Sequence, residues 1–153
     1  MTGPATAEDT LILHATTVAV EGRGMILMGS SGSGKSSLAL QMMALGADLV
    51  ADDRTIVARQ GGALVGACPP ALIGLIEARG IGLLRAPGAG PAILAHAVDL
   101  DRSETERMPP PRRISFLGVA LDLVLGQQTR HFPHALYHLL RHGRADGIGG
   151  SAE

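Results

Sequence analysis

The sequence contains very few cysteine and aromatic residues. Among 153 residues there are 1 cysteine, 1 tyrosine, 2 phenylalanines and no tryptophan. A single cysteine, Cys68, cannot form an intrachain disulfide or a thiolate metal cluster, so we expect a reducing, cytoplasmic environment. A buried Cys68 is favoured over a reactive thiol. Because stacking platforms for single-stranded nucleic acid need aromatic rings, we expect no nucleic-acid partner.

A strong net charge and a long apolar run are also missing. The chain has 13 basic and 14 acidic residues, so no field draws the whole chain to nucleic acid or to anionic lipid. It has no run of about 18 apolar residues that could span a membrane. The first ten residues, MTGPATAEDT, lack the basic and apolar regions of a signal peptide. We therefore expect no membrane association.

The length and the pattern of apolar residues predict one α/β domain over residues 10–143. Residues 1–9 are expected to be a disordered N-terminus, and residues 144–153 a flexible tail. Because short strands outnumber helices, we expect a mixed, strand-rich sheet. The expected strands are 11–20 (as one strand or two), 25–28, 48–51, 55–59, 63–65, 93–100 and 114–125; the expected helices are 35–45 and 133–141; and 101–113 is expected to be a polar loop.

Residues 29–36 read GSSGSGKS and fit the phosphate-loop (Walker A) pattern G-x-x-x-x-G-K-[ST]. An expected strand precedes them and an expected helix follows, which is the context that a P-loop kinase-like domain needs. Glycines let backbone N–H groups surround phosphate oxygens, Lys35 can reach the β- and γ-phosphates, and the Ser36 hydroxyl can hold Mg²⁺. The residues expected to bind the nucleotide are Gly29, Ser30, Ser31, Gly32, Ser33, Gly34, Lys35 and Ser36.

Two adjacent carboxylates, Asp52 and Asp53, follow the expected strand 48–51. Residues just beyond strand ends gather near the ligand in folds of this kind, so either carboxylate is a candidate to accept a proton. One of the pair can bind metal while the other handles the proton. The alternative is that Asp52, Asp53 and Arg54 simply form a polar turn.

Glu77 and Arg79 are two charged residues in the otherwise apolar run 75–84, LIEARGIGLL. In a strand, this spacing places both side chains on one face. Burying them unpaired would cost several kcal/mol. Either they pair with each other, or the face opens onto a cleft in which Glu77 binds metal and Arg79 contacts phosphate or a partner.

Histidines occur in two places that suggest chemistry. His14 precedes the glycine-rich stretch, although a lone histidine is more often structural than catalytic. His134, His138 and His142 are spaced for one helix face, with His131 just before them. Because no carboxylate or cysteine accompanies this group, a solvated helix face is favoured over a metal site.

Taken together, four features resemble the catalytic domain of HPr kinase/phosphorylase, which phosphorylates a serine of the bacterial phosphocarrier HPr. They are His14, GSSGSGKS at 29–36, LVADDR at 49–54 and IEARGIGLL at 76–84. The last two distinguish this family from other phosphate-loop proteins. The resemblance extends over residues 10–143 and is strongest to the short proteobacterial form.

The resemblance implies a role for each matching residue. ATP would lie on residues 29–36, with Mg²⁺ held by Ser36 and Glu77. Asp53 would take the proton of the acceptor serine and return one to the leaving group in the reverse reaction. Supporting roles would fall to Asp52, His14, Arg107 and Arg79. The family also assembles as hexamers, so we expect a homo-oligomer.

Some residues depart from the family pattern. Ser30 and Ser37 stand where the family commonly has Asp and Glu, and residues 123–129, LVLGQQT, lack the proline- and arginine-rich loop linked to dephosphorylation. The leading hypothesis is therefore an ATP-dependent serine kinase acting on an HPr-type carrier, with dephosphorylation as a further possibility. The alternatives are a nucleotide-binding regulatory module that binds a partner without phosphoryl transfer, and a small-molecule kinase with residues 101–113 as its lid.

Overall fold

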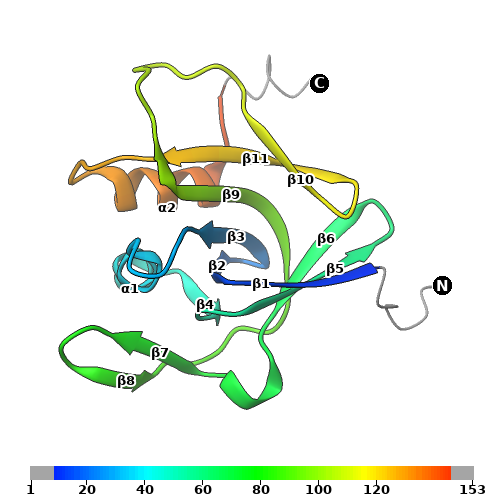
Figure 1. Cartoon of the computed structure of the whole chain (residues 1–153), viewed down its shortest axis with the longest axis vertical. Helices are drawn as coiled ribbons and strands as arrows, with labels where there is room; N and C mark the ends of the chain where they lie inside the picture. Colours follow the sequence, from blue (N-terminus) through cyan, green and yellow to red (C-terminus); the bar gives the residue numbers. More distant parts are fainter. Residues whose placement is uncertain (1–8, 146–153) are drawn as a thin grey trace.

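The computed structural model describes residues 9–145 and forms a nine-stranded mixed sheet, a two-stranded hairpin and two main helices (Figure 1). Residues 1–8 of the expected disordered N-terminus (1–9) and residues 146–153 of the expected flexible tail (144–153) lie outside the described part of the chain. The strands are β1 (Thr10–Leu13), β2 (Ala15–Val20), β3 (Arg23–Met28), β4 (Asp48–Ala51), β5 (Thr55–Gln60), β6 (Ala63–Ala67), β7 (Leu75–Ala78), β8 (Gly82–Arg85), β9 (Ala92–Ser103), β10 (Arg113–Phe116) and β11 (Val119–Gly126). The helices are α1 (Lys35–Leu45), the short 3₁₀ helix η2 (Pro70–Leu72) and α2 (Phe132–His142).

Three neighbouring strands of the large sheet run in the same direction. β9 pairs in parallel with β3 on one side and with β11 on the other. β2 is antiparallel to both β3 and β4. Parallel strands end at the same edge, so the segments that follow β3, β9 and β11 emerge on one side of the molecule (Figure 1). Ligands of α/β proteins commonly bind at such an edge.

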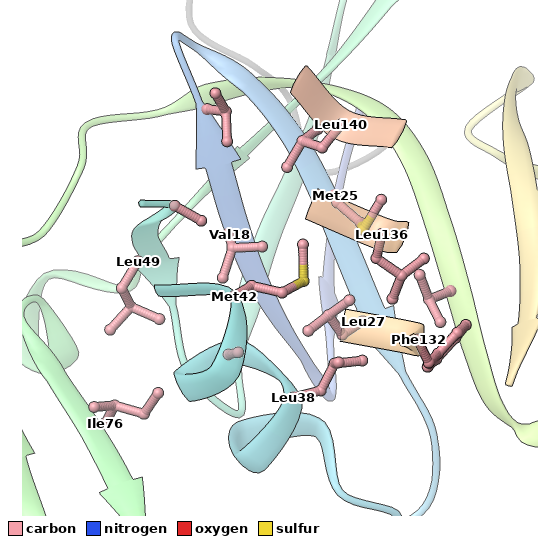
Figure 2. Close-up of a cluster of buried hydrophobic side chains, with 14 of the residues drawn as sticks. Val18, Met25, Leu27, Leu38, Met42, Leu49, Ile76, Phe132, Leu136 and Leu140 are labelled. Carbon is pink, nitrogen blue, oxygen red and sulfur yellow. The ribbon is translucent and has the colours of Figure 1, made fainter. Parts of the chain in front are cut away.

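The first hydrophobic core lies between this sheet and the two helices (Figure 2). β3 contributes Met25 and Leu27, which pack with Leu38 and Met42 of α1 and with Leu136 of α2. Each such side chain stabilises the fold by roughly 1.5–3 kcal/mol when it is fully buried. The core therefore fixes α1, and with it the segment that leads from β3 into α1.

A second core covers the opposite face of the central strands. Ile26, which alternates with Met25 and Leu27 along β3, packs there with Val57, Leu64 and Leu123. Since side chains of successive strand residues point to opposite faces, a strand buried on both sides is apolar at nearly every position. This double burial explains the continuous apolar run 25–28 in the sequence.

The expectations for the segments around the glycine-rich stretch are confirmed. α1 covers 35–45 and ends at Gly46, whose φ is 125° and whose N–H donates to the carbonyls of Met42 and Met43. β4 covers the expected 48–51. The expected stretch 11–20 is two strands, with a bend at His14 between them.

Two expectations were wrong. Residues 114–125 are not one strand, because the chain reverses at Leu117 and Gly118, whose φ values are 52° and 80°, between β10 and β11. The polar loop does not begin at residue 101, because β9 continues to Ser103, which is paired with Gly126 of β11. The loop between the strands is therefore 104–112.

The last described residues are held against the sheet. Arg144, which the sequence places in the flexible tail, donates through Nε to both carboxylate oxygens of Asp122 at 3.1 and 3.2 Å. His96 is hydrogen-bonded through Nδ1 to the same carboxylate at 2.8 Å. These contacts join Arg144 to the described sheet. Within residues 9–145, neither α1 nor α2 has the length and apolar character needed to cross a bilayer.

Candidate active site

The glycine loop, residues 29–34, joins β3 to α1 at the carboxyl edge of the sheet. Gly29, Gly32 and Gly34 have φ values of 155°, 85° and 102°, which side-chain-bearing residues rarely adopt. At Gly29 space is also short, because a Cβ atom would lie 2.4 Å from the Ser33 hydroxyl. The loop can take this tight form only because glycines occupy these positions.

Lys35, the first residue of α1, is hydrogen-bonded to the start of the glycine loop. Its side chain is only 7% exposed, and its Nζ donates to the carbonyls of Gly29 and Ser30 at 2.8 and 3.1 Å. The ammonium charge thus lies at the base of the loop, beside the N-terminus of α1, where the helix dipole is positive.

Asp101, on β9, holds the outer side of the loop. Its Oδ2 accepts the backbone N–H of Ser30 at 2.8 Å, and its Oδ1 accepts the Ser30 hydroxyl at 2.9 Å. These two bonds, together with the charge of Lys35, keep the pKa of Asp101 below its usual range. Sequence reasoning missed this residue. The signal that selected Asp52 and Asp53, a carboxylate near the end of an apolar strand, applies to Asp101 as well.

Asp52 connects three elements to the end of β4. Its Oδ1 accepts the hydroxyls of Thr16 at 3.0 Å and Ser36 at 2.6 Å, while its Oδ2 accepts the backbone N–H of Glu77 at 3.0 Å. The residue is only 9% exposed. A buried carboxylate must be hydrogen-bonded in this way, because leaving it unpaired is expensive. Asp52 therefore positions β2, α1 and β7 relative to one another.

Asp53 differs sharply from its neighbour. Its backbone has φ of 67°, and its N–H donates to the Thr16 hydroxyl at 3.1 Å. The carboxylate is exposed, and its Oδ1 lies 3.7 Å from Nδ1 of His14. Strained backbone of this kind, held by surrounding contacts, is common at functional positions. Asp52 and Asp53 form a bend, but they are not merely a polar turn.

One cavity of about 290 Å³ collects several of the predicted residues. It brings together side chains from the start of α1, from the bend after β4 and from the β7–β8 hairpin. Its lining residues are Ser31, Gly32, Gly34, Lys35, Ser36, Ser37, Asp53, Glu77 and Arg79. Positive and negative groups thus face a common space beside the glycine loop.

Glu77 and Arg79 both line this cavity, but not for the reason expected. Glu77 lies on β7, whereas Arg79 lies in the turn that leads to β8, where Gly80 has φ of 87°. The two residues do not share one strand face. The hairpin turn brings both side chains to the cavity, and both are exposed.

Other predicted residues lie outside the cavity lining. Asp52 is beneath it and His14 is beside Asp53, as described above. Gly29, Ser30 and Ser33 shape the glycine loop without lining this cavity. Arg107 is exposed in the loop 104–112, which extends from the sheet on the side opposite the β7–β8 hairpin (Figure 1).

Besides Asp101, two further residues of the site were not identified from the sequence. Ser37 lines the cavity but was considered only for its difference from the family pattern. Thr16 is fully buried on β2 and links Asp52 to Asp53. The signal for Thr16 was a pair of threonines, Thr16 and Thr17, in an otherwise apolar strand, where buried hydroxyls need partners.

The histidines of α2 make no comparable site. The rings of His138 and His142 lie with their centroids 4.5 Å apart. Throughout residues 9–145, no group of three or more His, Cys, Asp or Glu side chains is arranged to hold a metal ion. This finding does not apply to a cation that is held by only one or two protein side chains in the cavity beside the glycine loop.

These features define a mixed, strand-rich α/β protein in which a strand, a glycine loop and a helix frame the candidate site. A model of the family described as the HPr serine kinase C-terminal domain matches residues 6–88, which is more than half of the chain. The chain therefore belongs to that family. The resemblance seen in the sequence is confirmed.

Individual relatives agree with this assignment. The HPr kinase/phosphorylase of Burkholderia lata is 47% identical over 73 residues, which are 47% of this chain and 23% of that protein. The HPr kinase/phosphorylase of Clostridium botulinum is 40% identical over 72 residues, or 47% of this chain and 24% of that protein. The matched stretch is thus about a quarter of the length of these relatives.

A solved structure has a similar fold over most of the chain. The HPr(Ser) kinase/phosphatase from Coxiella burnetii superposes with a TM-score of 0.72 and 24% sequence identity. The alignment covers 86% of this chain and 94% of that one. At this identity the comparison establishes the fold, and it includes segments beyond residue 88, where the family match ends.

Proposed function

We propose that this chain is an ATP-dependent protein-serine kinase that phosphorylates an HPr-type phosphocarrier. The observation that carries the proposal is that Lys35, Ser36 and Asp53 line one cavity, so that a cation, a hydroxyl and a carboxylate from two separate segments face the same space. Its relatives are named HPr kinase/phosphorylase, which supports the reaction class and the acceptor. We also propose a cytoplasmic location, on the single cysteine of the chain, and a homo-oligomeric assembly, on the family resemblance alone.

The glycine loop and the start of α1 would bind the phosphates of ATP. The first N–H groups of a helix have no intrahelical partner and point outward from its N-terminus. Together with loop N–H groups they form an anion-binding cradle, and Lys35 adds a full positive charge. Binding of phosphate would draw the Lys35 ammonium from the loop carbonyls of Gly29 and Ser30 toward the phosphate oxygens.

The residues beside the loop fit a magnesium ion. Mg²⁺ prefers oxygen ligands and typically takes one or two protein side chains, with phosphate and water completing the set. Ser36 and Glu77 line the same cavity and supply such oxygens. Because the Ser36 hydroxyl donates its proton to Asp52, its lone pairs remain available to a cation. Bound there, Mg²⁺ would neutralise charge that builds up on the phosphates during transfer.

Asp53 would act as the general base of the transfer. The acceptor serine oxygen attacks the γ-phosphorus of ATP, the bond to the γ-phosphorus forms, and the bond from the γ-phosphorus to the β,γ-bridging oxygen breaks. ADP leaves, and the proton of the serine hydroxyl passes to the Asp53 carboxylate. Asp53 is the exposed member of the pair, whereas both oxygens of Asp52 already accept hydrogen bonds.

Neighbouring side chains would assist without taking the proton. Asp52 fixes the hydroxyl of Ser36 and, through Thr16, the backbone N–H of Asp53, so it would be a positioning residue. His14, 3.7 Å from Asp53, would orient that carboxylate. Arg79 would contact phosphate or the carrier from the hairpin turn. Arg107 would need the loop 104–112 to approach the site, and its role rests on the resemblance.

Phosphate transfer to a carrier tests the proposal directly. The chain is incubated with ATP, Mg²⁺ and an HPr-type protein from the same organism, and the carrier is followed by intact mass. We expect a gain of one phosphate on a serine. Asp53→Asn should slow transfer by about 10²–10⁴-fold, the usual contribution of a general base, while ATP affinity stays within about twofold.

Asp48→Asn is the matched control, because Asp48 is exposed at the other end of the same strand. It should transfer phosphate at the unaltered rate. Equal rates for Asp53→Asn and Asp48→Asn would remove Asp53 from the reaction. ATP binding with no transfer to any HPr-type carrier would contradict the kinase proposal and support the regulatory module instead.

A further inference from the structure

A second cavity, of about 420 Å³, adjoins the glycine loop. It lies between the start of α1, the end of β9 and the segment 126–133, which contains the connection from β11 to α2. The two cavities share Gly34 and Ser37 in their linings, so they are neighbours on either side of the helix start. In Figure 1 the β11–α2 connection emerges on the same side of the molecule as the glycine loop. Nothing in the phosphoryl-transfer scheme above uses this cavity.

We propose that this second cavity binds the nucleoside of ATP, with the amides of Gln127 and Gln128 recognising the base. The inference rests on the proposed function, because it assumes that the phosphates occupy the glycine loop. Gly34 and Ser37 form the boundary at which a chain of phosphates passes from the first cavity to the second. The volume is within the usual range for small-molecule sites, roughly 300–1,000 Å³.

The walls suit an adenine base. Leu38, Leu100 and Phe132 supply apolar surface, and Gln127 and Gln128 supply amide groups at the rim. A glutamine amide can donate and accept at once, which matches the amino group and ring nitrogen along an adenine edge. Guanine presents adjacent N–H donors that a carboxylate accepts best, and among the described residues that line this cavity none is Asp or Glu.

Charge also favours a nucleotide over a free anion in this position. Arg130 lies at the cavity rim and is exposed, while the other polar lining groups are neutral hydroxyls and amides. Such a lining tolerates the ribose and the neutral base, and it leaves phosphate binding to Lys35 in the first cavity. The first cavity would thus bind the phosphates of ATP, and the second would bind its ribose and base.

The experiment compares Mg²⁺-ATP with Mg²⁺-tripolyphosphate by isothermal titration calorimetry. Tripolyphosphate carries more negative charge than ATP, so a site that senses phosphate alone prefers it. We expect the unaltered chain to bind ATP about tenfold more tightly, and GTP about tenfold more weakly than ATP, a difference of about 1.4 kcal/mol in each case. Equal affinity for ATP and GTP would overturn base recognition by the two glutamines.

Two variants locate the effect. Ser103→Trp places a bulky ring at an exposed strand end that lines the cavity, and Gln127→Leu removes the amide. Each should weaken ATP about tenfold and leave tripolyphosphate within about twofold. Gln60→Leu, at the exposed end of β5, is the control and should change neither.

The outcomes separate the two proposals. If neither ATP nor tripolyphosphate binds the unaltered chain, the proposed function fails and the nucleoside site fails with it. If tripolyphosphate binds as tightly as ATP, the nucleoside site alone is overturned. The nucleoside site is likewise overturned if Ser103→Trp and Gln127→Leu weaken both ligands equally or neither of them.

Discussion

Oδ1 of Asp53 lies 3.7 Å from Nδ1 of His14, although the two residues belong to distant parts of the sequence. The contact follows from the pairing of β2 with β4, in which Thr17 is opposite Ala51. His14 immediately precedes β2, and Asp53 follows β4. Because the strands are antiparallel, the start of one meets the end of the other. The sheet therefore brings a histidine to the exposed carboxylate of the site.

Replacing His14 tests whether this contact serves the reaction. Both side chains are largely exposed, 71% and 62%, so the pair should contribute less than about 0.5 kcal/mol to the free energy of unfolding. We expect His14→Ala to lower kcat for carrier phosphorylation about tenfold, with KM for ATP and the urea midpoint unchanged. An unchanged kcat, measured at saturating ATP, would show that the contact is incidental.

Thr16 and Thr17 provide a matched pair of buried hydroxyls on β2. Thr16 links Asp52 to Asp53, whereas Thr17 is hydrogen-bonded to Thr55 at 2.9 Å, away from the cavity. Each Thr→Val change removes a buried hydrogen bond whose partner keeps a second one, Thr55 to the Ala15 carbonyl and Asp52 to Ser36. Each should therefore lower the free energy of unfolding by about 0.5–1.5 kcal/mol in urea titrations. Only Thr16→Val should also reduce kcat. Equal kcat losses in both variants would mean that Thr16 acts through stability alone.

Local sequence signals correctly predicted the strand and the helix that flank the glycine loop. Three local features predicted the strand, the loop and the helix. They are the apolar run before Gly29, the glycines of the loop, and Gly46, which ends the helix. These features depend on neighbours in the chain, so their pattern is visible without tertiary structure. The same reasoning failed at Leu117, because a leucine rarely takes a positive φ and gives no sign of a turn.

Long-range contacts were not available from the sequence. The bonds from Thr16 and Ser36 to Asp52 depend on which strands pair and in which register, and that is decided by the packing of both cores. Likewise, Ser103 is in β9 because Gly126 of β11 pairs with it, although the run DLDRS has poor strand propensity. The resemblance to a family supplied roles for residues, but not these contacts.

Asp101 offers a test of how the glycine loop is held. The carboxylate accepts two hydrogen bonds from Ser30, and an amide can replace only one of them, because its NH₂ group is a donor. Asp101→Asn should therefore speed amide hydrogen exchange in the loop peptide, residues 29–34, by about tenfold and weaken ATP binding. Ser30→Ala keeps the backbone bond and should have a smaller effect. Slower or unchanged exchange in Asp101→Asn would contradict the clamp.

Asp122 ties the end of α2 to the sheet and should contribute stability that depends on pH. Burial raises its pKa, but the hydrogen bond from His96 and the bonds and charge of Arg144 outweigh burial, so the pKa of Asp122 is lowered. A carboxyl group whose pKa is lower in the folded state than in the unfolded state stabilises the fold when the pH is above the unfolded-state pKa, about 3.9. This contribution disappears as the pH falls through the folded-state pKa.

Asp122→Asn should therefore reduce the free energy of unfolding by about 1–2 kcal/mol at pH 7. The difference from the unaltered chain should shrink as the pH falls from about 4 toward the lowered pKa of the folded carboxyl, because Asp122 of the unfolded chain is protonated first and that of the folded chain follows. Urea unfolding followed by circular dichroism from pH 3 to pH 7 measures both quantities. Asp48→Asn, at an exposed position on β4, is the control and should run parallel to the unaltered chain. A constant Asp122→Asn difference across this range would show that the charge of Asp122 does not stabilise the end of α2.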